Sequence, residues 1–185
     1  MNKLSLALLA LGCALTFTAA AQDTNVLKTE IGVFEARTGC VIIKGFEPMG
    51  TVNVGAAIIF IGSKESIDIS SGKSVYGITV SLGSAPNDRD RTLVDYDELE
   101  SLLKSIDYLN KIDYDVTTLP SFEATYSTKT GLRLIAHSIR REGTVQCYIQ
   151  YDDNARIPLS SIQMKQLYEL IEKAKKNLDA LREAK

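Results

Sequence analysis

A group of basic and aromatic residues in the second half of the chain has the chemistry to bind an anionic polymer or to stack on bases. The stretch RLIAHSIRR alternates as a strand does, and TVQCYIQY follows it after a short turn. Cations and rings that share one sheet face suit a polyanion, whereas the alternative is a solvated outer face on which tyrosines cover aliphatic stems. The residues are Arg133, His137, Arg140, Arg141 and Tyr148, which Arg37, Lys44, Lys129 and Arg156 join if the two halves of the chain align.

The only histidine, His137, is also a candidate general base or metal ligand. We interpret it instead as a strand residue on the polar side, where the neighbouring cations oppose its protonation. A typical zinc site needs further His or Cys ligands at short spacing, and a serine hydrolase of the G-x-S-x-G type needs that motif. The sequence offers neither, so it predicts no metal, no cofactor and no catalytic residue.

Six acidic residues gather in the stretch NDRDRTLVDYDELE, which is rich in the oxygen ligands that calcium prefers. The stretch lacks the mid-loop glycine and the ligand spacing of a calcium-binding loop, and two arginines are interleaved. Asp95 and Glu98 instead have the spacing of a capping box, in which each side chain bonds the backbone N–H near the other. We therefore interpret the stretch as a solvated loop followed by a helix start.

The N-terminal residues 1–21 have the layout of a secretory signal peptide: one cation, Lys3, then an apolar run and three alanines. We expect cleavage after Ala21 and a periplasmic or secreted protein. A lipoprotein anchored through Cys13 is the alternative that we favour less, because the apolar run continues past that cysteine. Cleavage leaves 164 residues (185 − 21) and a net charge of −3 (20 − 23), which gives no overall attraction to nucleic acid or anionic lipid.

Two cysteines remain after cleavage, Cys40 and Cys147, and both lie in strand-like runs. Export to an oxidising compartment allows a disulfide between them. The alternative is a pair of buried thiols that behave as small hydrophobic residues. The apolar run VGAAIIFIG has only nine residues, so we expect a buried strand there and no membrane span.

The first unit, residues 22–112, reads as four or five strands followed by one helix. We expect strands in residues 26–37 and 40–46, a turn at residues 47–50, and a further strand in residues 52–62. Residues 65–83 have the pattern of a hairpin around a Ser-Gly turn, and residues 92–94 form a short strand. A helix then begins at Asp95 and ends near Ile112, with leucine and isoleucine at helical spacing.

A linker, residues 113–121, leads to the second unit, residues 122–185, which repeats the order of strands and helix. Ser160 and Gln163 repeat the capping box, and Met164, Leu167 and Ile171 repeat the apolar stripe. The sequence therefore predicts an α+β fold with two repeats of an antiparallel four- to five-stranded sheet, each followed by an amphipathic helix. We expect each helix to cover its own sheet and the two units to form one compact domain.

This order of elements resembles the Whirly and Pur-type folds that bind single-stranded nucleic acid. The resemblance rests on VYGITVSLG, RTLVDYDELESLLKSIDYL and VQCYIQYDDNARIPLSSIQMKQLYELIEKA. It implies that nucleic acid would lie across the sheet, held by basic and aromatic side chains, although no motif of those families can be placed residue by residue.

The function that we expect is that of an exported, non-enzymatic binding or protein-interaction protein of unknown ligand. A Whirly-like binder of single-stranded nucleic acid or polyanions is the first alternative, and an uncharacterised hydrolase is the second. The partner is then an unidentified protein or polymer rather than nucleic acid, and the chain has the features of a candidate homodimer.

Overall fold

The computed structural model describes residues 28–83, 91–139, 143–152 and 155–184, and it contains two four-stranded antiparallel sheets. Sheet A has the order β1 (Ile42–Val54), β2 (Ala57–Asp68), β3 (Ser74–Gly83) and β4 (Arg91–Asp95). Sheet B has the order β5 (Ser121–Ser127), β6 (Leu132–Ile139), β7 (Thr144–Tyr151) and β8 (Ile157–Leu159). Each sheet is followed by a long helix, which confirms the predicted α+β class and the repeat of sheet plus helix. The leader, Cys13 included, lies outside the described residues.

Both helices begin where the capping boxes predict. The 3-10 turn η3 (Tyr96–Glu98) follows Asp95 and continues into α2 (Leu99–Lys111), whose C-cap is Ile112. The last helix, α3 (Ser161–Glu183), begins after Ser160, and Gln163 Oε1 accepts a hydrogen bond from the Ser160 backbone N–H at 2.8 Å. The buried side chains of both helices recur at helical spacing, as expected of helices that cover a sheet.

Each long helix covers the sheet of the other unit, which corrects the expectation that it covers its own. Helix α3 packs against β1, β2 and β3 of sheet A, whereas α2 packs against β5 and β6 of sheet B. Several hydrogen bonds join α3 to sheet A, among them Ser63 Oγ to the Ala174 carbonyl and Lys173 Nζ to the Met49 carbonyl. The two units therefore share one apolar core and cannot be separated without exposing both sheets.

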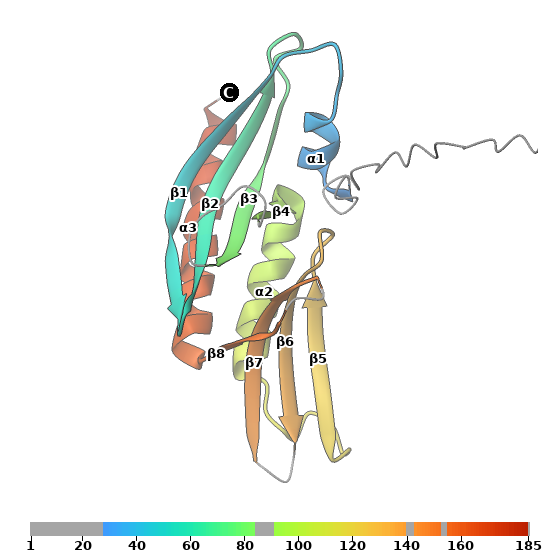
Figure 1. Cartoon of the computed structure of the whole chain (residues 1–185), viewed down its shortest axis with the longest axis vertical. Helices are drawn as coiled ribbons and strands as arrows, with labels where there is room; N and C mark the ends of the chain where they lie inside the picture. Colours follow the sequence, from blue (N-terminus) through green and yellow to red (C-terminus); the bar gives the residue numbers. More distant parts are fainter. Residues whose placement is uncertain (1–27, 84–90, 140–142, 153–154, 185) are drawn as a thin grey trace, which may run out of the picture.

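The two sheets lie side by side in one layer, and α2 and α3 pack against each other in a second layer behind it (Figure 1). Residues of both sheets and both helices contribute to the main core. The face of each sheet that points away from α2 and α3 is called its outer face below. On sheet A the helix α1 (Glu30–Glu35) covers part of the outer face, where it contacts β2, β3 and β4.

Residues 30–35 form a helix rather than the predicted strand. The Asp95 carboxylate accepts hydrogen bonds from the backbone N–H groups of Glu30 and Ile31, and Thr29 Oγ1 accepts one from Gly32 N–H. Ile31 and Phe34, three positions apart, pack with Val75 and Leu93 on the outer face. The strand-like pattern was misleading because a carboxylate 64 positions away caps this helix.

The turn predicted at residues 47–50 is a β-bulge inside β1. The register of β1 against β2 shifts between Pro48 and Gly50, and Gly50 has a φ of +151°. A Cβ at Gly50 would lie 2.6 Å from Leu170 Cδ2 of α3, so glycine allows the helix to approach the strand. The chain turns at Gly55 instead, and the predicted strand 52–62 is the end of one strand, a hairpin turn and the start of the next.

In the part of the chain that the structure describes, every helix is too short or too polar to cross a lipid bilayer.

Candidate ligand-binding site

The outer face of sheet A carries charged and aromatic residues in adjacent strand positions. In the antiparallel register Lys44 pairs with Ser66, Phe46 pairs with Lys64, and Pro48 pairs with Gly62. Paired residues point to the same side of a sheet, so these side chains share one face. Helix α1 places Glu35 at the edge of this group.

A cationic pocket forms around Glu35. Lys44 Nζ and Lys64 Nζ each lie 2.7 Å from a Glu35 carboxylate oxygen, and Ser66 Oγ donates to Oε1 at 2.5 Å. The Lys64 side chain is only 6% exposed, whereas that of Lys44 is 45% exposed. The pocket has a volume of about 410 Å³, and its remaining lining residues are Phe46, Thr79, Arg91 and Leu93. Three cations thus surround one carboxylate.

The excess of cations over carboxylates determines the electrostatics of the cationic pocket. Burial acts to raise the pKa of Glu35, but hydrogen bonds from Lys44, Lys64 and Ser66 outweigh it and lower the pKa below its usual value. Burial lowers the pKa of Lys64, and the charges of Lys44 and Arg91 lower it further, against the opposing effect of Glu35. An added negative charge would therefore relieve the repulsion among the three cations.

An apolar groove of about 230 Å³ adjoins the cationic pocket on the same face. Phe46, Pro48 and Phe60 line it, and Gly62 leaves it open because no side chain projects there. Phe46 and Arg91 line both hollows. Lys64 Nζ lies 5.3 Å and Arg91 Cζ 5.4 Å from the centroid of the Phe46 ring, so charge and apolar surface are adjacent.

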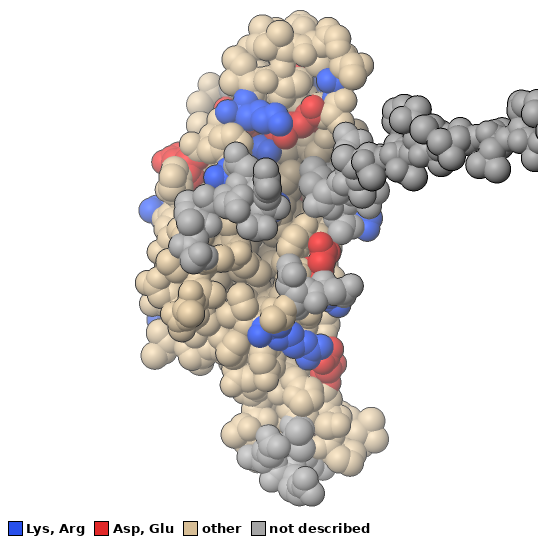
Figure 2. Space-filling view, viewed as in Figure 1, with Lys and Arg blue, Asp and Glu red and all other residues tan. Residues whose placement is uncertain are grey.

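The surface view supports this division of sheet A. Figure 2 shows charged side chains of both signs gathered over the upper part of sheet A, at the level of α1. Below them the described residues form a broad surface with few charged side chains, and a second small charged group follows over sheet B. The arrangement suits a ligand with one anionic end and one apolar end. The hydroxyl of the buried residue Ser66 donates its hydrogen bond to Glu35.

Three of the residues predicted to form a sheet face lie together on the outer face of sheet B. Arg133 and His137 flank Ile135 in β6, and Tyr148 pairs with Ile135 across β7. Ile135 is only 1% exposed, and Arg133 donates a hydrogen bond to the Asp152 carbonyl. Arg140 and Arg141 lie outside the described residues.

Of the four other cations proposed for that face, Arg156 joins it through Glu123, which pairs with His137, and the other three lie elsewhere. Arg156 Nη1 lies 2.8 Å from Glu123 Oε2, and Arg37 stacks over the Phe34 ring at 4.3 Å. Lys44 belongs to the cationic pocket of sheet A, and Lys129 is bound by carboxylates at the junction of the two units. Arg37, Lys44 and Lys129 therefore lie at three different places in the fold.

Both cysteines are free thiols in this structure, and both are half-buried. Cys40 precedes β1 in sheet A, whereas Cys147 lies in β7 of sheet B. Cys147 Sγ donates to the Leu109 carbonyl at 3.4 Å, and burial raises the pKa of this thiol. Cys147 thus contributes to the contact between β7 and α2.

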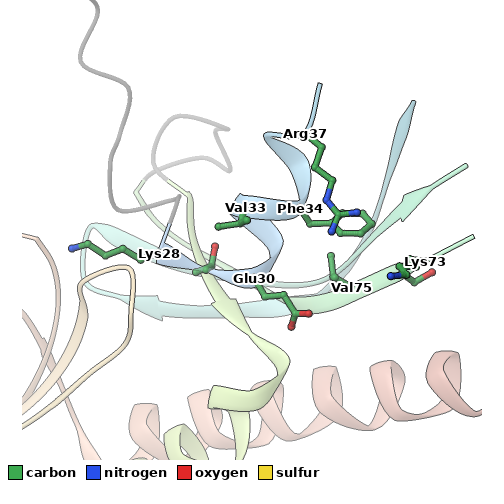
Figure 3. Close-up of a pocket in the computed structure, with 9 residues that line it drawn as sticks. Lys28, Glu30, Val33, Phe34, Arg37, Lys73 and Val75 are labelled. Atoms are coloured by element: carbon green, nitrogen blue, oxygen red, sulfur yellow. The ribbon is translucent and has the colours of Figure 1, made fainter. Parts of the chain in front are cut away.

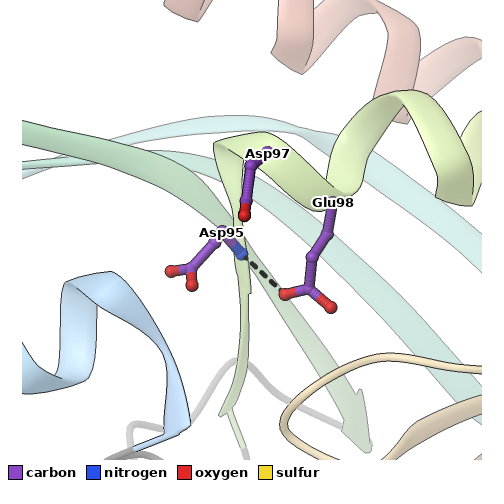
Figure 4. A group of neighbouring side chains, drawn as sticks. All are labelled: Asp95, Asp97 and Glu98. Atoms are coloured by element: carbon purple, nitrogen blue, oxygen red, sulfur yellow. Dashed lines mark hydrogen bonds between the residues drawn. The ribbon is translucent and has the colours of Figure 1, made fainter.

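Asp95, Asp97 and Glu98 form a cluster of three carboxylates with one oxygen each within 4.8 Å of the others. Their carboxylates point toward different neighbours, Asp95 toward α1 and Glu98 toward the β5–β6 turn (Figure 4). Asp95 accepts from two N–H groups of α1, and Glu98 accepts from the N–H groups of Asp95 and Lys129. The cluster therefore joins segments of the fold, and its oxygens already have partners.

Lys129 supplies the cation that this cluster needs. Its Nζ lies 3.1 Å from Asp95 and 3.0 Å from Asp97. Burial acts to lower the pKa of Lys129, but the two carboxylates outweigh it and raise the pKa to about 12. The Lys129 ammonium stays charged at neutral pH and lies between the Asp95 and Asp97 carboxylates.

A further hollow of about 550 Å³ lies beside α1. Phe34 and Val75 line it, with Arg37 stacked on Phe34 (Figure 3). The two lysines, Lys28 and Lys73, lie at opposite ends of the hollow in that view. Its cations therefore do not converge as those around Glu35 do, and it is the weaker candidate.

The comparisons with known proteins identify no relative: no family model, no curated protein and no solved structure matches this chain. The resemblance to Whirly and Pur-type folds stays a prediction.

Proposed function

We propose that the protein is an exported, non-enzymatic binding protein and that it binds its ligand on the outer face of sheet A. The proposal is based on one observation: the cationic pocket and the apolar groove adjoin each other, and Phe46 lines both. Concave surfaces that combine apolar walls with a few convergent polar groups are the usual form of a ligand site. The helices α2 and α3 lie behind the sheets, so they leave this face accessible.

The outer face of sheet B supports the proposal less well. Its central position is filled by Ile135, and its cations Arg133 and Arg156 bond to the Asp152 carbonyl and to Glu123. A polyanion binder needs a track of cations along the backbone of its ligand. The cations of sheet A are instead confined to one pocket, which favours a compact ligand over a polymer.

Binding of the neutral dye Nile red tests the proposed face without any contribution from ligand charge. The Phe46 side chain is 52% exposed, so Phe46→Ala removes a wall of the groove without opening the core. We expect this variant to weaken dye binding by about tenfold, as the loss of one apolar contact of this size implies. A fluorescence titration measures the affinity, and circular dichroism checks the fold.

Two further variants make the test specific. Tyr108 on α2 is 57% exposed and lies on the helix side, so Tyr108→Ala is the matched control and should bind the dye as the wild type does. Tyr148→Ala tests the outer face of sheet B. The proposal fails if Tyr148→Ala abolishes dye binding while Phe46→Ala leaves it unchanged, or if the wild type does not bind the dye.

A further inference from the structure

We infer that the ligand is a small amphiphilic anion, with a carboxylate or phosphate group in the cationic pocket and an alkyl chain or ring in the apolar groove. This inference rests on the proposed function, because it names the ligand of the same face. It follows from the charge balance of the pocket, from the contact between the two hollows and from the confinement of the cations.

The charge balance favours an anion. Glu35 is the only acidic residue among the lining residues of the cationic pocket, and both of its oxygens already accept from Lys44, Lys64 or Ser66. Lys44 and Lys64 together carry one positive charge more than Glu35 balances. A carboxylate or phosphate can receive charge-assisted hydrogen bonds from such donors.

The geometry requires the apolar part of the ligand to begin next to its charge. Phe46, Thr79 and Arg91 line both hollows, and Lys64 Nζ and Arg91 Cζ lie 5.3 and 5.4 Å from the Phe46 ring centroid. A ligand that places its anionic group near Lys44 and Arg91 therefore extends directly onto Phe46. The groove between Phe46 and Phe60 then accepts an alkyl chain or a flat ring.

The confinement of the cations favours a single anionic group over a polymer. Between this pocket and the charged group over sheet B, the described residues present few charged side chains (Figure 2). The chain also carries 23 acidic against 21 basic residues, which gives no overall attraction to a polyanion.

Displacement of Nile red by four compounds that share an unbranched eight-carbon chain tests the ligand class. We expect octanoate and octyl phosphate to displace the dye with about tenfold higher affinity than octanol, because only they place a charge in the pocket. Octyltrimethylammonium should bind more weakly than octanol. The two anions also decide between a carboxylate and a phosphate as the preferred group. Shortening octanoate to hexanoate should weaken binding by about fourfold per methylene.

The double variant Lys44→Gln/Arg91→Gln should remove the preference for the anions and leave the affinity for octanol unchanged. The matched control is Lys104→Gln/Lys111→Gln, which removes the same charge from exposed positions of α2 and should keep the preference.

Each outcome of this experiment decides one proposal. Equal displacement by octanol and octanoate overturns the anionic ligand but keeps the binding face, provided that Phe46→Ala still weakens dye binding. Displacement by single-stranded DNA that falls steeply with salt, without displacement by octanoate, replaces the small anion with a polyanion. Loss of the Phe46 effect overturns the proposed function itself.

Discussion

At the scale of single residues, Asp95 determines how α1 is held. Its side chain is fully buried and accepts hydrogen bonds from Glu30 N–H, Ile31 N–H and Lys129 Nζ. One carboxylate thus connects α1, the start of α2 and the β5–β6 turn. Asp97, whose side chain is 66% exposed, shares Lys129 with it.

We expect Asp95→Ala to lower the free energy of unfolding by about 3 kcal/mol, because it leaves two N–H groups of α1 without their acceptor and removes the buried ion pair with Lys129. Asp97→Ala is the matched control, since it removes an exposed partner of the same lysine, and it should cost less than about 1 kcal/mol. Urea denaturation measures both values. Equal losses for the two variants would show that the buried position of Asp95 has no special importance.

The sequence predicted some residue roles and missed others for a physical reason. The capping boxes at Asp95 and Ser160 depend on residues three positions apart, so they were visible in the sequence. The site residues Glu35, Lys64 and Arg91 come from three separate elements, and their meeting depends on the position of α1. The only signal in the sequence was Lys64 itself, the single cation among residues 57–68.

At the scale of elements, the main difference from the prediction is that each long helix covers the sheet of the other unit. We call this arrangement the exchange of the helices. The apolar stripes of α2 and α3 were predicted, because helical periodicity is a local property. The choice of sheet is not local, since either stripe suits either apolar face. Contacts such as that between Gly50 and Leu170 favour α3 on sheet A.

Crosslinking tests the exchange directly. Asn177 Nδ2 of α3 donates to Glu47 Oε2 of β1 at 2.6 Å, across 130 positions of sequence. In a Cys40→Ser/Cys147→Ser background, we expect Glu47→Cys/Asn177→Cys to be joined by a short bismaleimide within one chain, as mass spectrometry would detect.

The control pair is Ala124→Cys/Asn177→Cys, which places the second thiol on the helix-facing side of sheet B, the sheet of the same unit as α3. We expect no crosslink for that pair in the folded protein. A crosslink to position 124 and none to position 47 would show that α3 covers its own sheet.

At the scale of the whole molecule, the exchange decides which surfaces remain for binding. Both long helices lie behind the two sheets, so the outer faces point to the same side (Figure 1). On sheet B the central outer position is filled by Ile135, whereas on sheet A the groove at Phe46 stays open. The order of strands and helices in the sequence predicted two sheets, each followed by a helix. It did not predict which face of which sheet would stay accessible.

The central claim is that the outer face of sheet A binds an amphiphilic anion, and an NMR titration of the 15N-labelled protein with octanoate tests it most directly. The account predicts that amide shifts concentrate in residues 44–48, 62–66 and 79–81, and that Lys44→Gln/Arg91→Gln reduces them. Shifts that concentrate instead around Tyr148, or on α2 and α3, would contradict the account, as would the absence of any shift at millimolar octanoate.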